Sequence, residues 1–591
     1  MENFTFDTIE YVRPDYDAAR KCWESAAQRV KEAQSYGELK AVMEEVNRMA
    51  GHLETMYTVC MVRNTLDTTD TFYEKEMEYN DDTFPTVKEA ELAYEKALLD
   101  SPFAGELEAE YGHELLAGIQ RSLDSFDPKL VPFMQKDSRL CTRYQKLMAT
   151  AQIPFRGEVY NLYGIQKFFE DRDRQTRKEA FRAWSDFYRD NEAEMEDIFA
   201  QLVEVRNEMG RALGDENFIP LGYKKQGRGD YGKKEVEAFR KQVLEEIVPL
   251  CEKLYEAQAK RIGVDELMVY DESCVFPDGN AVPAGDDDYM IEQARRMYHE
   301  ISPETGEFID FMIEHQMMNL KNLPNKASTG YMTSLLDYKA PFVFSCFNHT
   351  IFDMQVLTHE LGHAFAGYQA MRHQPVPDYY GMSTDIAEIH SMSMEQFAYP
   401  YAEWFFGEDA DKYRFQHLQE AVTFVPYGVA VDEFQHIMYE HPELTPKERT
   451  LEWRKLEKKY MPWRKYEDDE FMERGGYWYY KLHIFLYPFY YINYTLTTMG
   501  AMEMKKRYEQ NREEAWKDYL ALCNAGGSKS YLGLLKVANL SVPFVFAHGF
   551  GHKKRAPIHP QCGANRRSMY ITIFNFICYN CMVFKTSAFF D

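Results

Sequence analysis

The sequence predicts a mainly α-helical protein in two lobes, with a small β element beside one central helix. Its 591 residues are too many for one small hydrophobic core, so we expect two lobes. Apolar residues recur at helical spacing over long stretches of the first half. One short apolar and aromatic segment, residues 341–347, looks like a strand. No internal repeat or low-complexity linker interrupts this pattern.

Capping patterns mark helix starts on both sides of the chain's centre. Ser35-x-x-Glu38 has the form of a capping box, and an amphipathic series follows it as far as Cys60. Residues 274–288 combine Pro, Gly and Asp, which predicts a loop or a small hairpin. Thr445-Pro-x-Glu448 repeats the capping pattern, with proline at the first helical position.

A helix is predicted over residues 350–372, with Asn348 or Thr350 as its cap. Its apolar residues recur at three- and four-residue steps. They are Phe352, Val356, Leu357, Leu361, Ala364, Phe365 and Tyr368.

This helix contains His359-Glu360-Leu-Gly-His363. Residues four apart lie on one face of a helix, so both imidazoles can reach the same ion. Neutral imidazole suits a tetrahedral zinc that keeps one position open for water, and Glu360 can take a proton from that water. The pattern on a helix therefore indicates a zinc peptidase site.

The segment 341–347 directly precedes the metal-binding helix. A strand here would place an edge next to the zinc, and an extended peptide could be held there by main-chain hydrogen bonds. The alternative, a strand that only fills the core, is equally compatible with the sequence.

A third ligand is required, and the position after the motif excludes one arrangement. A metzincin would have Gly and His where this chain has Ala366 and Gln369. A carboxylate on a following helix remains, and Glu388 is our candidate, with Asp385 and Glu395 as acceptors for the imidazole N–H groups. A solvated helix face is the alternative. Apolar neighbours make this helix look buried, and buried carboxylates need partners.

An aromatic segment lies further downstream, from His483 to Tyr494. Tyr487, Tyr491 and Tyr494 are spaced as one stripe of a helix that begins near Pro488. Such a stripe is more often part of a core. It could also aim phenol and imidazole donors at the oxyanion that forms during hydrolysis.

Taken together, these segments resemble the oligoendopeptidase F and thimet oligopeptidase family of zinc metallopeptidases, on the oligoendopeptidase or Pz-peptidase side. The resemblance is carried by residues 359–365, 387–395 and 483–494, with support from 347–353. It extends from the N-terminus to about Pro543.

The resemblance implies one Zn²⁺ on His359, His363 and Glu388, with Glu360 as the general base. It implies substrate and transition-state donors, namely His483, Tyr487, Tyr491 and Tyr494. The family's fold is two helical lobes around a deep channel with zinc at its bottom. By analogy we divide this chain into an N-terminal lobe, 1–190, and a catalytic lobe, 191–546.

The resemblance further implies an endopeptidase that cuts short, unstructured oligopeptides. Two alternatives stay open. A dipeptide-releasing exopeptidase of the same fold would need a group that captures the substrate's C-terminal carboxylate, and the sequence shows none clearly. A helical protein that holds zinc without turnover would have no use for a general base at Glu360.

Composition argues against two classes of partner. The net charge of −27 and the pI of about 5.1 argue against nucleic acid and anionic membranes. An acidic channel could attract cationic peptides, although solubility also explains the charge. The N-terminus lacks a signal pattern, no apolar stretch is long enough to span a membrane, and the cysteines are scattered. We therefore expect a cytoplasmic protein with reduced thiols.

The C-terminal segment, residues 547–591, departs from the rest of the chain. It is basic, rich in Phe, Ile, Asn and Cys, and lacks helical periodicity. A shifted reading frame, a disordered extension and a genuine accessory tail are all compatible with this composition. Cys578 and Cys581 have the spacing of a metal-binding pair, but a single pair is a weak signal.

Overall fold

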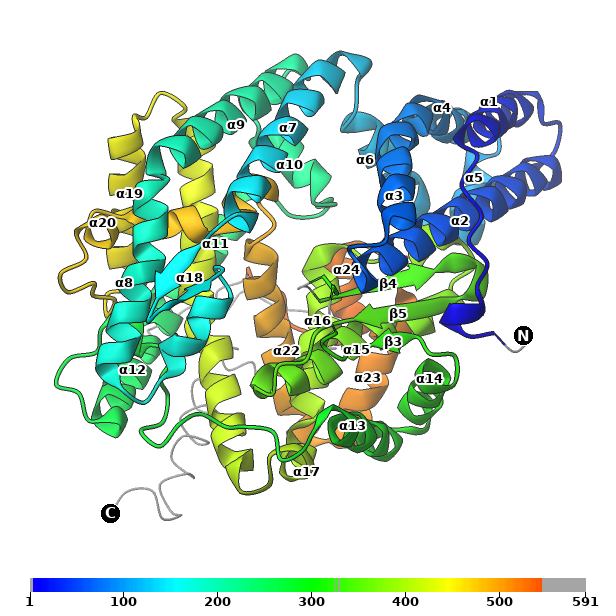
Figure 1. Cartoon of the computed structure of the whole chain (residues 1–591). Coiled ribbons are helices and arrows are strands. Elements are labelled where there is room, and N and C mark those ends of the chain that lie inside the picture. Colours follow the sequence, from blue (N-terminus) through cyan, green and yellow to red (C-terminus); the bar gives the residue numbers. More distant parts are fainter. Residues whose placement is uncertain (1–3, 324, 328–329, 545–591) are drawn as a thin grey trace, which may run out of the picture.

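The computed structural model describes residues 4–323, 325–327 and 330–544. Within them the chain is mainly helical with small sheets, as predicted (Figure 1). The predicted extension at 547–591 and its cysteine pair lie outside the described residues. Among the described helices, none is both long and apolar enough to cross a bilayer.

The helices of the first half are α1 (Tyr16–Glu32), α2 (Tyr36–Leu66), α3 (Thr71–Thr83), α4 (Lys88–Leu99), α5 (Ala104–Tyr111), α6 (His113–Asp124), α7 (Val131–Ala149), α8 (Arg174–Asp190), α9 (Glu192–Ala212), α10 (Ile219–Lys225), α11 (Lys233–Gln242), α12 (Val248–Ile262), α13 (Asp287–Ile301) and α14 (Pro303–Glu314). Those of the second half are α15 (Ile351–His373), α16 (Thr384–Phe397), α17 (Ala402–Phe406), α18 (Ala410–Glu440), α19 (Pro446–Tyr460), α20 (Glu470–Glu473), α21 (Leu482–Leu486), α22 (Ile492–Gln510), α23 (Arg512–Ala525) and α24 (Tyr531–Val537).

The predicted helix starts are confirmed by their caps. The Ser35 hydroxyl accepts the backbone N–H of Glu38 at the start of α2. Thr445 caps α19 in a capping box with Glu448, and Pro446 is the first helical residue. Residues 272–286, which cover most of the predicted loop, contain no strand or helix.

The buried apolar residues form two clusters. The smaller cluster lies within residues 16–123 and is joined by Val376 and Tyr379. The larger cluster contains residues from Phe6 to Phe544 and includes α15, α16, α18 and α22. In Figure 1 the blue N-terminal helices lie at one side of the molecule and the yellow helices at the other. The lobe boundary near residue 190 stays a prediction.

A three-stranded sheet lies between the N-terminal helices and α15. Its strands are β3 (Met318–Asn319), β4 (Tyr331–Leu335) and β5 (Ala340–Phe344), in the order β3-β5-β4. β5 pairs in parallel with β3 and antiparallel with β4. β4 contacts α2 on one side and α15 on the other. A separate antiparallel hairpin, β1 (Ile153–Phe155) and β2 (Glu158–Tyr160), was not foreseen from the sequence.

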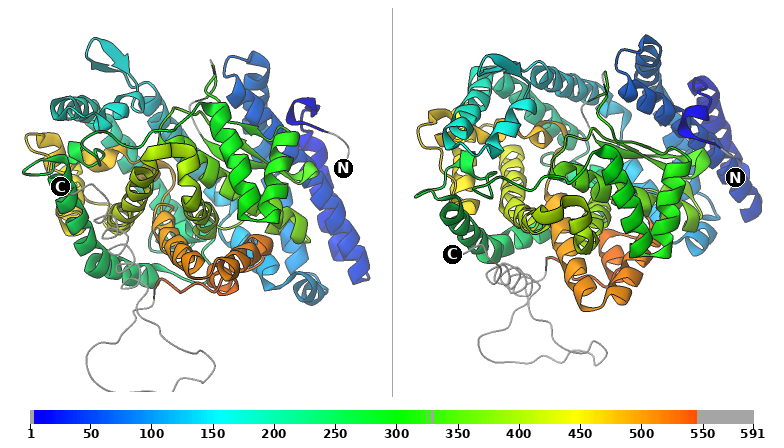
Figure 2. Two further views of the ribbon diagram at one scale, coloured as in Figure 1. Left: turned by 90° about the horizontal axis from the view of Figure 1, so that it is seen from below. Right: turned by 60° about the horizontal axis from the view of Figure 1, so that its bottom comes forward.

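Five helices form the centre of the larger core. α16 packs against both α15 and α22, α15 packs against α23, and α22 packs against α18. The two views of Figure 2 show the orange helices α22 and α23 lying beside the green helices of the middle of the chain. The residues of the predicted site are distributed over these helices and the segment before α22.

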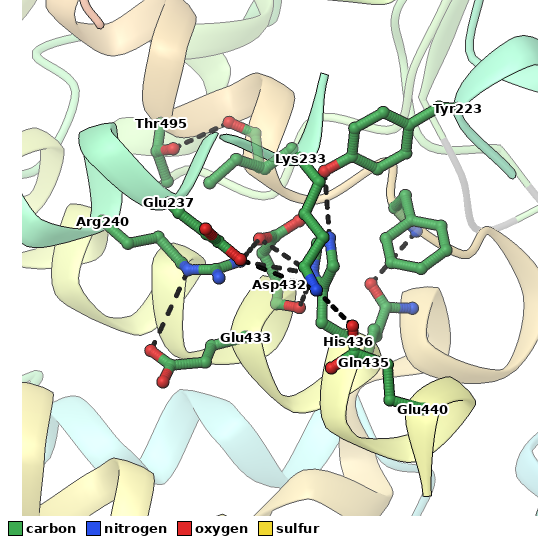
Figure 3. A network of polar contacts seen from close by, with 12 residues as sticks. Tyr223, Lys233, Glu237, Arg240, Asp432, Glu433, Gln435, His436, Glu440 and Thr495 are labelled. Atoms are coloured by element: carbon green, nitrogen blue, oxygen red, sulfur yellow. Dashed lines mark hydrogen bonds and ion pairs between the residues drawn. The ribbon is translucent and has the colours of Figure 1, made fainter. Parts of the chain in front are cut away.

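A buried polar network fixes α18 to the preceding helices (Figure 3). Arg240 of α11 forms an ion pair with Asp432 of α18, and Asp432 is completely buried. One turn further along α18, the imidazole Nε2 of His436 lies 2.9 Å from the Tyr223 hydroxyl. Because a buried charge is tolerated only when it is paired, this network holds α18 in one register against α10 and α11.

Candidate active site

The metal-binding motif lies on α15, as the sequence predicted. Thr350 is the cap, since its hydroxyl accepts the backbone N–H of Phe352 at 3.2 Å. The rings of His359 and His363 are nearly perpendicular, with centroids 4.9 Å apart. One ring nitrogen of each lies within 4.8 Å of the other and of a Glu388 carboxylate oxygen, so the two imidazoles converge beside the helix.

Glu388 of α16 brings a carboxylate to the same point. Its Oε2 lies 3.2 Å from His359 Nε2 and 3.4 Å from His363 Nε2. Ligand atoms 2.0–2.1 Å from a tetrahedral ion lie about 3.3 Å from one another, so these spacings fit zinc. Burial acts to raise the pKa of Glu388, but the imidazoles of His363 and His359 outweigh it and the pKa falls well below its usual range.

Glu395, two turns after Glu388 on α16, joins three helices. It accepts a hydrogen bond from Nδ1 of His359 at 2.6 Å, which leaves Nε2 of that ring for a metal. Its second oxygen pairs with Nε2 of His417 on α18. Burial opposes ionisation of Glu395, but these two imidazoles hold its pKa at about 2. The other ring nitrogen of His417 lies 2.6 Å from the Tyr399 hydroxyl.

Asp385 does not contact either imidazole, contrary to the prediction from spacing. It is buried in the first turn of α16, where it accepts hydrogen bonds from the hydroxyls of Tyr231 and Ser383. The prediction rested on its spacing of three residues from Glu388, which places Asp385 near the helix face that carries Glu388. The segment before α11 packs against this end of α16 and supplies its partner instead.

The two metal-binding helices touch at Gly362, a position that the motif leaves open. A Cβ at this glycine would lie 2.8 Å from the Cα of Ser391 on α16. Contacts that short do not occur, so only glycine allows this separation of α15 and α16. The distance from the histidines to Glu388 is therefore set by backbone contact.

The tyrosine segment is arranged differently from the predicted helical stripe. α22 begins only at Ile492, and Phe489 has φ of +63°, so residues 487–491 do not continue the helix. Proline at 488 could start a helix, but the residue after it has a left-handed backbone conformation, which prevents one. As a result Tyr487 is 49% exposed, whereas Tyr491 is buried.

Tyr490, which the stripe omitted, lies beside the metal ligands together with Tyr494. Burial raises the pKa of Tyr490 to about 12, and the charge of Glu388 adds to the rise. The pKa of Tyr494 is raised further, first by burial and then by Glu388, with Glu360 contributing. The rings of the two tyrosines are 5.3 Å apart. The four-residue spacing of Tyr490 and Tyr494 also fits one face of a helix. The prediction that a helix begins near Pro488 favoured Tyr487, Tyr491 and Tyr494 instead.

His483 faces the same tyrosines. Its ring centroid lies 4.8 Å from that of Tyr491, 5.7 Å from Tyr490 and 5.9 Å from Tyr494. Burial, with a smaller contribution from the charge of Lys481, lowers the pKa of His483 to about 3. The imidazole is therefore neutral near pH 7 and can donate one hydrogen bond.

Two cavities lie near the candidate metal-binding residues, one lined by His363 and the other by Glu395. The first, which we call the acidic cavity, has a volume of about 490 Å³ and is bounded by the N-terminal helices, β4, and the side of α15 at His363. Glu54, Glu95 and Asp378 line it, and partial burial raises the pKa of Glu95 to about 7. Its described lining residues include no lysine or arginine.

The second, which we call the lysine cavity, has a volume of about 330 Å³ and lies on the opposite side of the ligands. α15 contributes Gln355, one turn before His359, to this cavity, whereas it contributes Gly367, one turn after His363, to the acidic cavity. The other residues that matter here are Glu395, Glu420, Lys481, His483 and Tyr494.

The exposed edge of the sheet belongs to β4, not to the predicted strand at 341–347. β5 is the central strand, with β3 and β4 on its two sides. In the ladder Ser334 is paired with Pro341. Because proline has no N–H, Ser334 belongs to a non-hydrogen-bonded pair, and its backbone groups, like those of Met332, point to the outer edge. Both residues line the acidic cavity beside His363.

Two family models match the chain. The Peptidase M3 N-terminal domain matches residues 6–126, and Peptidase family M3 matches residues 168–275 and 307–547. A curated relative, an oligoendopeptidase F homolog of Borreliella burgdorferi, is 21% identical over 469 residues, which cover 78% of this chain and 75% of the relative.

The chain is also similar to solved structures over nearly its whole length. The structure of Pz peptidase A with an inhibitor is 41% identical, with a TM-score of 0.89, and covers 99% of this chain and 100% of that chain. A Bacillus anthracis structure assigned to oligoendopeptidase F is 38% identical, with a TM-score of 0.85, and covers 99% of both chains.

Proposed function

Because the chain belongs to peptidase family M3, whose model matches more than half of its residues, we propose that it is a zinc endopeptidase of short, unstructured oligopeptides. The observation that carries this proposal is the convergence of His359 Nε2, His363 Nε2 and Glu388 Oε2. The three atoms lie within 4.8 Å of one another. Two neutral imidazoles and one carboxylate form a donor set that zinc uses in catalytic sites.

His359, His363 and Glu388 would hold the ion, and Glu395 and His417 would keep the ring of His359 oriented. When bound, zinc supplies a Lewis acid that polarises the peptide carbonyl and makes a water molecule more acidic. Glu388 and Glu395 bring two carboxylates to this centre, which balances the charge of a divalent cation in a buried place.

Glu360 is the proposed general base. It lies beside His359, and within the described residues its carboxylate has no hydrogen-bond or ion-pair partner. It is therefore free to accept a proton from the attacking water and to deliver it to the leaving amine. A protein that only stored zinc would gain nothing from an unpartnered carboxylate at this position, which argues against the non-catalytic alternative.

The donors for the oxyanion are proposed to be His483, Tyr490 and Tyr494. His483 is neutral and the two tyrosines keep their protons at any physiological pH, so all three can donate. A hydrogen bond to an oxygen that becomes negative only during attack lowers the barrier without tightening substrate binding. Tyr487 and Tyr491, which the family resemblance also implies, stay proposals of lower rank because one is half-exposed and the other is packed in the core.

The substrate is proposed to bind in an extended form along β4. The outward backbone groups of Met332 and Ser334 can form a ladder with a peptide, and both residues line the cavity that reaches His363. A folded protein cannot offer such a strand to a site bordered by two cavities. The seven cysteines of the described part are free thiols, which favours a reducing compartment, so we place the activity in the cytoplasm.

Glu360→Gln tests this function most directly. The variant should retain zinc, since Glu360 is not a ligand, and should lose about 10²–10⁴-fold or more in kcat. Metal analysis and cleavage of a mixed peptide library are run on the same preparation. Near-native turnover by a zinc-loaded variant would refute the role of Glu360, and cuts found only two residues from C-termini would favour the exopeptidase.

A further inference from the structure

Lys481 is a half-buried cation without an ion-pair partner at the edge of the proposed active site. It lines the lysine cavity together with His483 and Tyr494. Its Nζ lies 4.6 Å from the ring centroid of Tyr480 and 4.7 Å from that of Tyr491. Among the described residues, none forms an ion pair or a hydrogen bond with its ammonium group. Burial lowers its pKa to about 7, so aromatic rings alone do not compensate its charge.

The two lysines that are buried in the described part of the chain, Lys326 and Lys505, are compensated. The Nζ of Lys326 donates to the backbone carbonyls of Asn319, Lys321 and Ser345. Lys505 forms an ion pair with Glu509. Lys481 differs from both, because its ammonium group has no such partner and the residue lines a cavity that a ligand could enter.

The acidic groups of the lysine cavity do not supply the missing partner. Glu395 is engaged by the imidazoles of His359 and His417. Glu420 is exposed and accepts a hydrogen bond from Gln416 at 2.9 Å. Neither forms an ion pair with Lys481.

We propose that the lysine cavity is a subsite for a substrate carboxylate, and that Lys481 is the residue that pairs with it. The inference rests on the proposed function, because it concerns peptides that are cleaved beside this cavity. With a volume of about 330 Å³, the cavity lies at the small end of ligand pockets, so it suits a side chain or a chain end.

A peptide carboxylate has two sources, the free C-terminus and the side chain of Asp or Glu. Both present the same pair of oxygens to an ammonium group. Capture of the C-terminus would favour cleavage near the end of short substrates. In that case Lys481 would be the carboxylate-binding group that a dipeptide-releasing enzyme requires. Capture of a side chain would give an endopeptidase with a preference for an acidic residue at one fixed position.

The test uses zinc-loaded enzyme and four forms of one peptide with a single cleavage site and one glutamate beyond it. The forms have a free or an amidated C-terminus, each combined with Glu or Gln. The wild type should lose about 10–100-fold in kcat/KM, mainly through KM, when the recognised carboxylate is removed. Loss on amidation identifies the C-terminus as the source, and loss on Glu→Gln identifies the side chain.

Lys481→Met keeps the length of the side chain without its charge and should cleave all four forms at the rate of the least favoured one. Lys481→Arg should retain part of the preference, and Lys505→Met, a matched loss of a buried lysine elsewhere, should retain all of it. Equal rates for the four forms with wild-type enzyme would overturn the proposal, as would an unchanged preference in Lys481→Met. Failure to cleave any form would instead count against the proposed function.

Discussion

The acidic cavity and the lysine cavity both contain an ionisable group without a full counter-charge, and the two groups have opposite charges. Each group is half-buried, Glu95 in one cavity and Lys481 in the other. Burial moves both pKa values to about 7, from opposite directions. Such groups cost stability and persist where a ligand can compensate them. The residues proposed to hold the metal lie between the two cavities, so the proposed site has an acidic side and a basic side for a peptide.

The proposed oxyanion donors should act on the rate of the chemical step and not on substrate binding in either cavity. Tyr494→Phe should lower kcat by about 10²–10³-fold with little change in KM, because the lost hydroxyl meets an oxygen that becomes negative only in the transition state. Tyr490→Phe should behave in the same way, since Tyr490 also lies beside Glu388. The fold should be preserved, because phenylalanine keeps the ring.

Tyr487→Phe separates the structural assignment from the family resemblance. The half-exposed Tyr487 should have nearly wild-type kcat if Tyr490 is the donor. Steady-state kinetics and thermal unfolding of the three variants decide the matter. A large loss of kcat in Tyr487→Phe alone would return the role to the residue that the resemblance implies.

The metal centre should respond to Glu395 but not to Asp385. Glu395→Ala frees the ring of His359 and should weaken zinc retention or activity about 10–100-fold. Asp385→Ala should change zinc retention little, because Asp385 bonds to Tyr231 and Ser383. Dialysis against a mild chelator, followed by metal analysis, measures both, with Glu388→Ala as the reference for loss of a ligand. Equal retention in Glu395→Ala and wild type would contradict the relay through His359.

The lysine cavity should destabilise the fold at low pH. The pKa of Lys481 falls from 10.5 to about 7 on folding, so stability is lost as pH decreases between these values. Lys481→Met should therefore raise the free energy of unfolding below pH 7, on the order of 2 kcal/mol, and give no gain above pH 10.5. Denaturant unfolding at about pH 6 and about pH 9 measures the difference. A gain independent of pH would mean that packing, not charge, is responsible.

The acidic cavity should show the opposite dependence. The pKa of Glu95 rises from 4.5 to about 7, so its contribution is lost as pH increases through this interval. Lys88 and Glu91 on the same helix, Ser122 and Asp378 all act on this carboxyl. Glu95→Gln should stabilise the fold above pH 7, on the order of 1–2 kcal/mol, and should be neutral below pH 4.5. If the gain in the free energy of unfolding changed with pH in the same direction for Glu95→Gln and Lys481→Met, the contrast between the cavities would be refuted.

The sequence predicted the parts of the site that depend on local spacing. The motif on α15 and Glu388 on α16 follow from helical periodicity, and the caps of Ser35, Thr350 and Thr445 follow from side-chain chemistry. The stripe at 487–494 was wrong as a helix because one residue, Phe489, adopts a left-handed backbone that no pattern revealed.

The remaining parts depend on contacts between distant segments. His417 reaches Glu395 from α18, and Tyr231 reaches Asp385 from the segment before α11. The edge at β4 depends on the pairing of Ser334 with Pro341, which sequence order did not indicate. Such positions are set by packing, and single-sequence patterns do not contain that information.

The glycine between the two motif histidines has a consequence for ion exchange. Because α15 and α16 already touch at Gly362, the spacing of the ligands does not depend on an ion drawing the helices together. The proposed metal site would then have a fixed spacing, which would accept ions of matching radius and release them without repacking of the helices. Larger divalent ions should then fit poorly, while ions of zinc's size can replace one another in a folded enzyme.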